Sequence, residues 1–217
     1  MMRHLCRNSI IVLLFGALAS CAAPVKEQDR AGFISDYSTL EKVAEKAYLF
    51  TSPKVAKYSK FRIDGPTMLI ETDDDEVGSE FTDADIDELR HYFRQQLEES
   101  ITKDGGYEVV NEPGEGVATI RIAITAVDAT VGALNVALFT KVTGAGLGGA
   151  AMEGEMVDSV TGEQLAAAVQ WGSGSRVLRA GFTRLGDAKL QINRWTRNLR
   201  ERIDAAHKNS IEVPDQS

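Results

Sequence analysis

The chain has 217 residues, of which 43% are hydrophobic, and its 32 acidic residues outnumber 24 basic ones to give a formal net charge of −8. This length accommodates one folded domain after an N-terminal leader is removed. A net negative charge repels phosphate backbones, so the composition argues against a nucleic-acid-binding protein. The chain has two cysteines, too few for a disulfide-rich scaffold.

The first 21 residues resemble the signal of a bacterial lipoprotein. Two arginines precede a short apolar run over residues 10–18, and the small residues Ala19 and Ser20 stand directly before Cys21. A signal peptidase requires small side chains before the bond that it cleaves, here the bond between Ser20 and Cys21. In the lipobox, which this pattern resembles, the thiol of the first mature residue carries diacylglycerol. We therefore predict that Cys21 is lipidated and anchors the protein to a membrane.

The alternatives are an ordinary secretory signal and a single N-terminal anchor helix. An ordinary signal needs no cysteine at the cleavage point, and a spanning helix needs about 20 apolar residues, about twice the length of this run. Each buried methylene of an acyl chain contributes about 0.8 kcal/mol, so several chains hold a protein stably at a membrane. Residue 22 is alanine and not aspartate. By resemblance to Gram-negative lipoproteins, this favours the outer membrane, with the domain in the periplasm.

The predicted boundaries follow from this signal. Residues 1–20 form the signal peptide, residues 21–31 a polar lipidated tether, and residues 32–217 a single domain. The other cysteine leaves with the signal peptide, so no thiol remains for a disulfide, a metal site or nucleophilic catalysis. Phe33 and Tyr37 stand among turn-forming residues just after the tether, and we expect this piece to dock on the domain.

The first half of the predicted domain contains short strands and one helix. Strands are expected at residues 48–51 and 61–71, the second broken by a turn at Gly65-Pro66. Thr82 can cap the helix that follows, with Asp85 at the capping-box position, and a pair of glycines ends it. The apolar stripe of this helix is formed by Ile86, Leu89, Phe93 and Leu97.

The second half is dominated by strands. Residues 107–111 and 117–127 predict strands, and the isoleucines of the latter share one face, as in a half-buried strand. Residues 150–160 and 164–171 flank a hairpin turn at Thr161-Gly162. A long amphipathic helix follows, with the stripe Ala188, Ile192, Trp195, Leu199, Ile203 and Ala206. The predicted fold class is therefore α+β, with two amphipathic helices packed on one face of a largely antiparallel sheet.

Three segments together form a further pattern. They are Gly32–Ser38 with Leu40, the strand Ile120–Asp128, and the hairpin segments 150–155 and 158–163. This pattern resembles the bacterial lipoproteins grouped as domain of unknown function 3313, over nearly the whole mature chain. Similar Asp-x-x-Thr-Gly-Glu hairpins occur in other periplasmic α+β lipoproteins, which include accessory subunits of envelope transport and assembly machines. The resemblance implies a compartment and a fold, but no activity.

Several motifs could indicate a ligand site. Residues 144–149 match G-x-G-x-x-G, but a strand is predicted after them, whereas a dinucleotide site requires a helix there. The acidic run Asp73–Glu76 lacks the alternation and the glycine of a calcium loop. His91 and His207 have no second histidine at ligand spacing, and we expect both at the surface. No G-x-S-x-G elbow is present. We therefore expect no metal, no cofactor and no enzymatic activity.

The Gly/Ala-rich segment 130–149 is predicted to be a loop. Gly144 and Gly148 have the small-xxx-small spacing of packed membrane helices. Lys141 lies near the middle of the apolar run and argues against a spanning helix. Two interpretations stay open, a loop that is mobile or contacts a partner and a hairpin that touches the membrane or self-associates.

The C-terminal third is locally basic, with nine basic and three acidic groups between residues 176 and 208. On a helical wheel, Arg194 and Arg197 lie opposite Trp195 and Leu199. The two arginines form either a solvated face that complements acidic parts of the domain or a contact for an anionic envelope polymer, a lipid phosphate or an acidic partner. We therefore expect a non-catalytic accessory or assembly subunit of a cell-envelope complex. Binding of an anionic envelope ligand through the C-terminal helix is the alternative.

Overall fold

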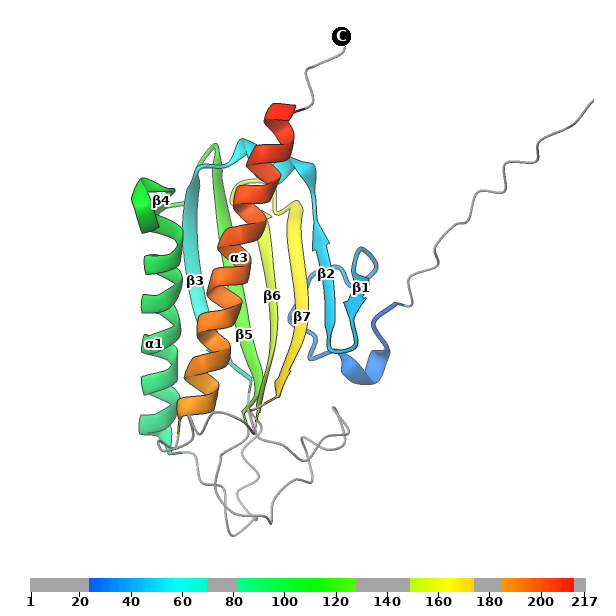
Figure 1. Ribbon diagram of the computed structural model, residues 1–217, viewed down its shortest axis with the longest axis vertical. Helices are drawn as coiled ribbons and strands as arrows, with labels where there is room; N and C mark the ends of the chain where they lie inside the picture. The colour runs from blue at the N-terminus through cyan, green and yellow to red at the C-terminus, as the bar shows by residue number, and fades with distance from the viewer. Residues whose placement is uncertain (1–23, 70–81, 128–148, 174–184, 213–217) are drawn as a thin grey trace, which may run out of the picture.

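A computed structural model of the chain describes residues 24–69, 82–127, 149–173 and 185–212 (Figure 1). Strands and helices follow in the order strands, helix, four strands, helix, as the sequence predicts. The elements are η1 (Glu27–Asp29), β1 (Glu41–Ala44), β2 (Ala47–Thr51), η2 (Pro53–Lys57), β3 (Lys60–Met68), α1 (Asp83–Thr102), η3 (Lys103–Gly105), β4 (Glu108–Val110), β5 (Val117–Val127), β6 (Gly149–Asp158), β7 (Gln164–Ser173) and α3 (Gly186–Glu212).

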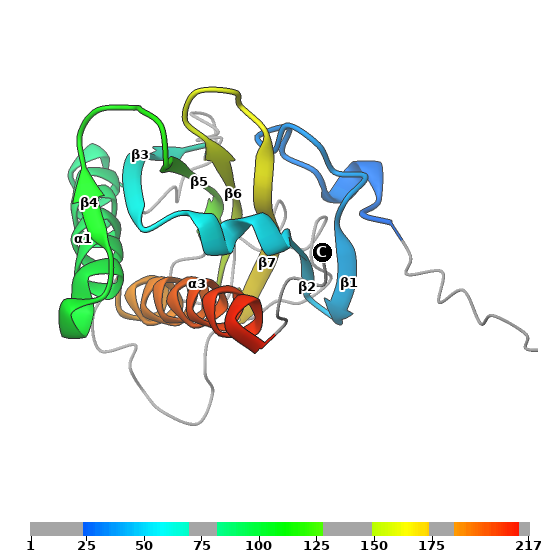
Figure 2. The same cartoon turned by 90° about the horizontal axis from the view of Figure 1, so that it is seen from above.

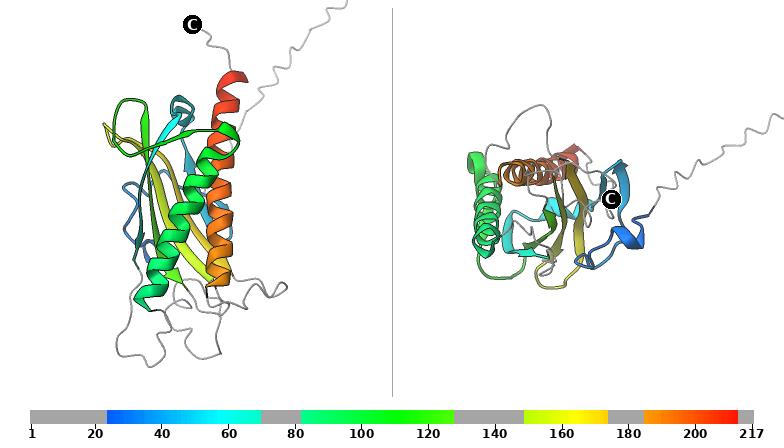
Figure 3. Two further views of the ribbon diagram at one scale, coloured as in Figure 1. Left: turned by 90° about the vertical axis from the view of Figure 1, so that its left-hand side faces the viewer. Right: turned by 90° about the horizontal axis from the view of Figure 1, so that it is seen from below.

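The seven strands form one sheet in the order β1-β2-β7-β6-β5-β3-β4. Strand β3 runs parallel to β4 and β5, and all the other neighbours are antiparallel. Both long helices lie on the same face of this sheet, and the chain before β1 lies on the other face (Figures 2 and 3). The α+β class with a largely antiparallel sheet is therefore confirmed.

Helix α1 begins at the predicted capping box. The Thr82 hydroxyl accepts a hydrogen bond from the amide of Asp85 at 3.3 Å, and the amide of Thr82 donates to Asp85 Oδ2 at 2.7 Å. The amide of Thr82 is thereby paired, and the amide of Asp85, which also donates to the Thr82 carbonyl at 2.9 Å, gains a second acceptor. The buried stripe of the helix comprises Leu89, Phe93, Leu97 and Ile101. Each such side chain contributes about 1.5–3 kcal/mol when fully buried.

Helix α3 packs against α1 as well as the sheet. The rings of Phe93 and Trp195 have centroids 6.2 Å apart. The Arg200 guanidinium donates to the carbonyls of Ser100 and Ile101 at 2.9 and 3.0 Å. A cation is favourable at this position, because the last carbonyls of a helix carry partial negative charge. The two helices are thus joined by both apolar and polar contacts.

A second, smaller core lies on the other face of the sheet. Its buried residues are Val25, Ile34, Leu40, Tyr48, Ala167 and Val169. The predicted docking of the segment around Phe33 and Tyr37 is therefore confirmed. The packed region begins earlier than the predicted domain start, since Val25 is 1% exposed and its carbonyl accepts bonds of 2.8 and 3.2 Å from the Arg30 guanidinium. This packing shortens the stretch after Cys21 that can act as a free tether.

The predicted break at Gly65-Pro66 is confirmed in part: strand β3 continues to Met68, but its pairing with β5 is interrupted there, and the register shifts between Asp64 and Thr67. One prediction about the strands was wrong. Strand β5 is not half-buried, because Thr119 and Ala123, which face away from its isoleucines, are 4% and 0% exposed. The second face of the sheet carries its own cover, which alternation within β5 cannot reveal.

Candidate functional site

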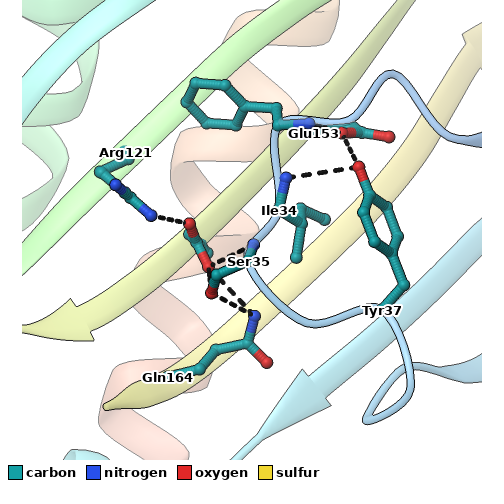
Figure 4. Close-up of polar contacts among 8 residues, drawn as sticks. Ile34, Ser35, Tyr37, Arg121, Glu153 and Gln164 are labelled. Carbon is teal, nitrogen blue, oxygen red and sulfur yellow. Dashed lines mark hydrogen bonds and ion pairs between the residues drawn. The ribbon is translucent and has the colours of Figure 1, made fainter. Parts of the chain in front are cut away.

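Two buried carboxylates on β6 hold the N-terminal segment against the sheet (Figure 4). Glu153 is 1% exposed. Its Oε1 accepts a bond from the Ala31 amide at 2.7 Å, and its Oε2 accepts bonds from the Phe33 amide at 3.0 Å and the Tyr37 hydroxyl at 2.5 Å. The Tyr37 oxygen in turn accepts the Ile34 amide at 3.3 Å. The buried carboxylate of Glu153 therefore binds three residues of one turn, Ala31, Phe33 and Tyr37.

Glu155 lies two residues further along the same face and holds the next part of the segment. Its Oε2 accepts bonds from the Ser35 amide at 3.1 Å, the Ser35 hydroxyl at 2.6 Å and the Gln164 side chain at 3.0 Å. The guanidinium of Arg121, on the neighbouring strand β5, forms an ion pair with Oε1 (Figure 4). We call Glu153, Glu155 and the segment 31–37 that they bind the carboxylate latch.

The electrostatics of the latch favour a fixed structural role. Burial alone would raise the pKa of Glu155, but the hydrogen bonds from Ser35 and Gln164 hold that pKa below its ordinary value. Burial and the bond to Glu153 raise the pKa of Tyr37 to about 12, so this hydroxyl remains a donor. Buried carboxylates are stable only when such donors replace water. The donors for both carboxylates are supplied mainly by the N-terminal segment.

A carboxylate also stabilises the turn of the hairpin between β6 and β7. Asp158 Oδ1 accepts bonds from the amides of Val160 and Thr161 at 3.0 and 2.6 Å, and Oδ2 accepts the Tyr58 hydroxyl at 2.7 Å. These bonds lower the pKa of Asp158 to about 2. Gly162 takes a φ of +74°, which glycine adopts without strain. The spacing of acid, threonine and glycine in this hairpin therefore builds a turn.

The helix face of the sheet contains an apolar groove beside α3, with a cavity of about 70 Å³. The floor is formed by β6, β7 and β2, and α3 forms one wall. Lining residues that lie toward the surface are Ala166, Ala168, Leu199 and Arg202. Deeper lining residues, such as Met152 and Trp195, belong to the main core. The sequence did not indicate this groove, since it depends on where α3 crosses the sheet.

The structure places Arg194 and Arg197 on the exposed side of α3, with Trp195 buried. Neither arginine makes an ion pair or hydrogen bond with any residue that the structure describes. Arg202 lines the mouth of the groove and likewise has no ion pair within the described ranges. These three side chains are therefore available to an anionic partner. Arg200, in contrast, is bound to α1.

The two histidines predicted at the surface differ in their exposure to solvent. His91 is exposed, with Nδ1 3.1 Å from the Asp87 carbonyl. His207 is half-buried, because its Nε2 lies 3.0 Å from the Tyr58 carbonyl and its ring packs on Tyr107 with centroids 5.2 Å apart. The prediction of a surface position was wrong for His207. Among the described residues, no group of three histidine, cysteine or acidic side chains is arranged to hold a metal ion.

Several predicted features lie outside the described residues. They are Ser20 and Cys21 at the predicted cleavage and lipidation site, the acidic run Asp73–Glu76, and the Gly/Ala-rich segment up to residue 148. Within the described part of the chain, no helix has the length and apolar character needed to cross a membrane.

Sequence reasoning missed the latch. Glu153 and Glu155 alternate with Met152, Gly154 and Met156, and this alternation places both carboxylates on one face of a strand. Two acids at that spacing within an apolar strand were the available signal. Their partners lie about 120 residues away in the chain, however, so the signal predicts burial or binding without naming the donor.

Solved structures with remote similarity exist. The PelC dodecamer from Paraburkholderia phytofirmans matches at 12% identity over 71% of this chain and 96% of that chain, with a TM-score of 0.43. A Xanthomonas campestris protein of the DUF330 family matches at 10% identity over 72% of this chain and 89% of that chain, with a TM-score of 0.41. Both TM-scores are low, so neither structure supports an inference about the function of this chain. No protein with a curated description matches it.

The family comparison is more informative. The model of the proteins of unknown function DUF3313 matches residues 29–199. This range contains the carboxylate latch and the hairpin turn at Asp158, the segments on which the predicted resemblance was based. The chain therefore belongs to the DUF3313 family.

Proposed function

We propose that this protein is a lipid-anchored, non-catalytic subunit of a cell-envelope complex, located at the outer membrane with its domain in the periplasm. The observation that carries the proposal is the carboxylate latch. It fixes residues 31–37, which begin ten residues after the predicted lipidation site, to the sheet. Glu153 accepts hydrogen bonds from the amides of Ala31 and Phe33 and from the Tyr37 hydroxyl, and Glu155 accepts one from the Ser35 amide. A segment that served only as a flexible leash would need no such contacts.

The burial of Val25 limits how far the domain could move from a membrane. Three residues separate Cys21 from Val25, which is buried in the second core. Four extended residues span at most roughly 14 Å. A lipid on Cys21 would therefore hold the domain close to the bilayer and restrict its orientation. Such a restriction suits a subunit that must meet a membrane-embedded partner in one pose.

The acidic side chains of β6 and its hairpin have structural roles, and this supports a non-catalytic function. Glu153 and Glu155 bind the N-terminal segment, and Asp158 builds the hairpin turn. Their oxygens are occupied by donors from the chain itself. A general acid or base must instead reach a substrate proton within hydrogen-bond distance.

Gentle detergent extraction of the full-length protein, followed by mass spectrometry of co-purifying proteins and lipids, tests the proposal. We expect one larger membrane protein in stoichiometric amount. Extraction of the Cys21→Ala chain is the matched control, and we expect it to lose both palmitate labelling and the membrane fraction. A C21A chain that still incorporates palmitate would contradict lipid anchoring, and absence of any stoichiometric protein would contradict the subunit role.

The exposed arginines of α3 favour a second candidate, binding of an anionic envelope ligand. Arg194 and Arg197 have no ion pair within the described residues. Charge reversal of both to glutamate should weaken binding of an anionic polymer and remove its salt dependence. Reversal of Lys54, which pairs with Glu163 at 2.5 Å, is the control and should have no such effect. Equal loss in both variants would contradict this candidate.

A further inference from the structure

We propose that the apolar groove between α3 and strands β2 and β7 binds one acyl chain of an anionic phospholipid, with Arg202 beside the headgroup. This inference goes beyond the subunit role, because it assigns a ligand to a site that the anchor does not use. The groove is lined by residues of α3 and of the helix face of the sheet. The N-terminal segment occupies the other face (Figure 3).

The floor of the groove is low because its side chains are small. In the register of the sheet, Gly154 of β6 stands beside Ala168 of β7, which stands beside Leu49 of β2. The neighbouring row places Met156 beside Ala166 and Thr51. Ala166 and Ala168 are half-buried. A helix packed over the two alanines leaves space that larger side chains would fill.

The walls are almost wholly apolar. Trp195 and Leu199 of α3 face the floor from one side, and Leu49 of β2 lies on the same face of the sheet. Glu155 also borders the groove, but its carboxylate is bound to Ser35 and Arg121. A ligand rich in hydroxyl or amide groups would find few partners on such walls, whereas a hydrocarbon chain would exclude water from them.

The charge at the mouth selects an anionic headgroup. Arg202 lines the groove, is exposed, and has no ion pair with any described residue. A guanidinium is the side chain best suited to a phosphate oxygen. A cation at the mouth of an apolar groove therefore fits a phospholipid with net negative charge.

Trp195 allows a direct test, because it lines the groove. The lipidated full-length protein carrying Trp171→Phe is placed in nanodiscs of phosphatidylcholine, so that Trp195 is the only tryptophan. Short-chain phosphatidylglycerol with brominated acyl chains is then added, and phosphatidylcholine with the same chains serves as the headgroup control. We expect concentration-dependent loss of Trp195 fluorescence with the anionic probe and little loss with the zwitterionic one.

Two variants assign the quenching to the groove. Arg202→Gln should weaken the apparent affinity by about tenfold, as expected for loss of one charge-assisted hydrogen bond. Arg197→Gln, on the exposed side of the same helix, should leave it unchanged. Ala168→Leu should abolish quenching by filling the floor, with near-ultraviolet circular dichroism to confirm the fold. Ala166→Leu replaces it if the first variant does not fold.

The proposal is overturned if the wild-type groove gives no quenching, if both headgroups quench equally, or if R202Q and the filled variant behave like the parent. Co-elution of the protein with the nanodiscs is recorded in the same experiment. Failure of the lipid anchor would appear there as loss of co-elution, so it is distinguished from failure of the groove to bind lipid.

Discussion

The Tyr37 hydroxyl donates a 2.5 Å hydrogen bond to Oε2 of Glu153, a residue 116 positions further along the chain. The same tyrosine oxygen accepts the amides of Gly32 and Ile34 at 2.9 and 3.3 Å. The phenol therefore links a buried carboxylate to a turn that would otherwise leave two amides without partners. This contact makes the N-terminal segment part of the fold.

Replacement of Glu153 should release that segment. Because Glu153→Ala leaves the donors of Ala31, Phe33 and Tyr37 unpaired, we expect a loss of about 2–4 kcal/mol in the free energy of unfolding. Urea denaturation measures this loss, and hydrogen exchange should show lost protection at residues 31–37. Glu163→Ala is the control, since its pair with Lys54 is exposed and contributes at most about 1 kcal/mol. Equal effects in the two variants would contradict the latch.

The latch should weaken in acid. The pKa of Glu155 is held below its ordinary value of 4.5 by hydrogen bonds that outweigh the effect of burial. A group whose pKa is lower in the folded state stabilises fully above its unfolded pKa and loses that contribution as the pH falls through the folded pKa. The free energy of unfolding should therefore fall on acidification below pH 4.5. Glu155→Gln should flatten this part of the pH profile. Parallel profiles for parent and variant would refute the assignment.

Gly65 should not tolerate a side chain. Its φ is +94°, and a Cβ there would lie 2.9 Å from the amide nitrogen of Thr67. Gly65→Ala should therefore destabilise the protein by roughly 1–3 kcal/mol. Gly114→Ala is the matched control, because the nearest atom to its Cβ is 4.0 Å away on Val117. Thermal unfolding distinguishes the two, and similar melting temperatures would show that β3 can relax around the new methyl group.

The face of the domain that carries Val25 should lie nearest the membrane. Trp171 packs against the second core, which includes Val25, whereas Trp195 lies in the main core on the helix face. Energy transfer to a dansyl-labelled lipid headgroup should therefore be stronger from Trp171. We expect Trp171→Phe to remove most of the transfer in lipidated protein on vesicles. If the remaining Trp195 transfers as efficiently as the parent, the domain is oriented differently.

Local signals in the sequence predicted the elements well. The capping box at Thr82 and the hairpin turn at Thr161-Gly162 are both present, because each depends on residues within four positions of one another. Strand β1 was not predicted. Its residues Glu41–Ala44 are all exposed, so they carry no alternation of apolar and polar side chains.

Contacts between distant segments could not be predicted in this way. Among the donors that bind Glu153, Ala31 ends the predicted tether, and Phe33 and Tyr37 belong to the piece that was expected to dock. Nothing near Glu153 in the sequence indicates that its carboxylate is their acceptor. The groove depends on the path of α3 over Ala166 and Ala168, which is a property of the assembled sheet. Arg194 and Arg197 could be placed on the exposed side of their helix, but the role of Arg202 at the groove mouth required the tertiary structure.

The alternation of β6 also determines how the sheet is assembled. Glu153 and Glu155 face the N-terminal segment, and Met152 and Met156 face the helices. A slip of β6 by one residue against β5 would turn two carboxylates into the main core and both methionines out of it. Such misaligned pairings are strongly disfavoured, since buried acids without donors are costly. The same two glutamates that hold the N-terminus thereby select the one strand alignment from which the native sheet can form.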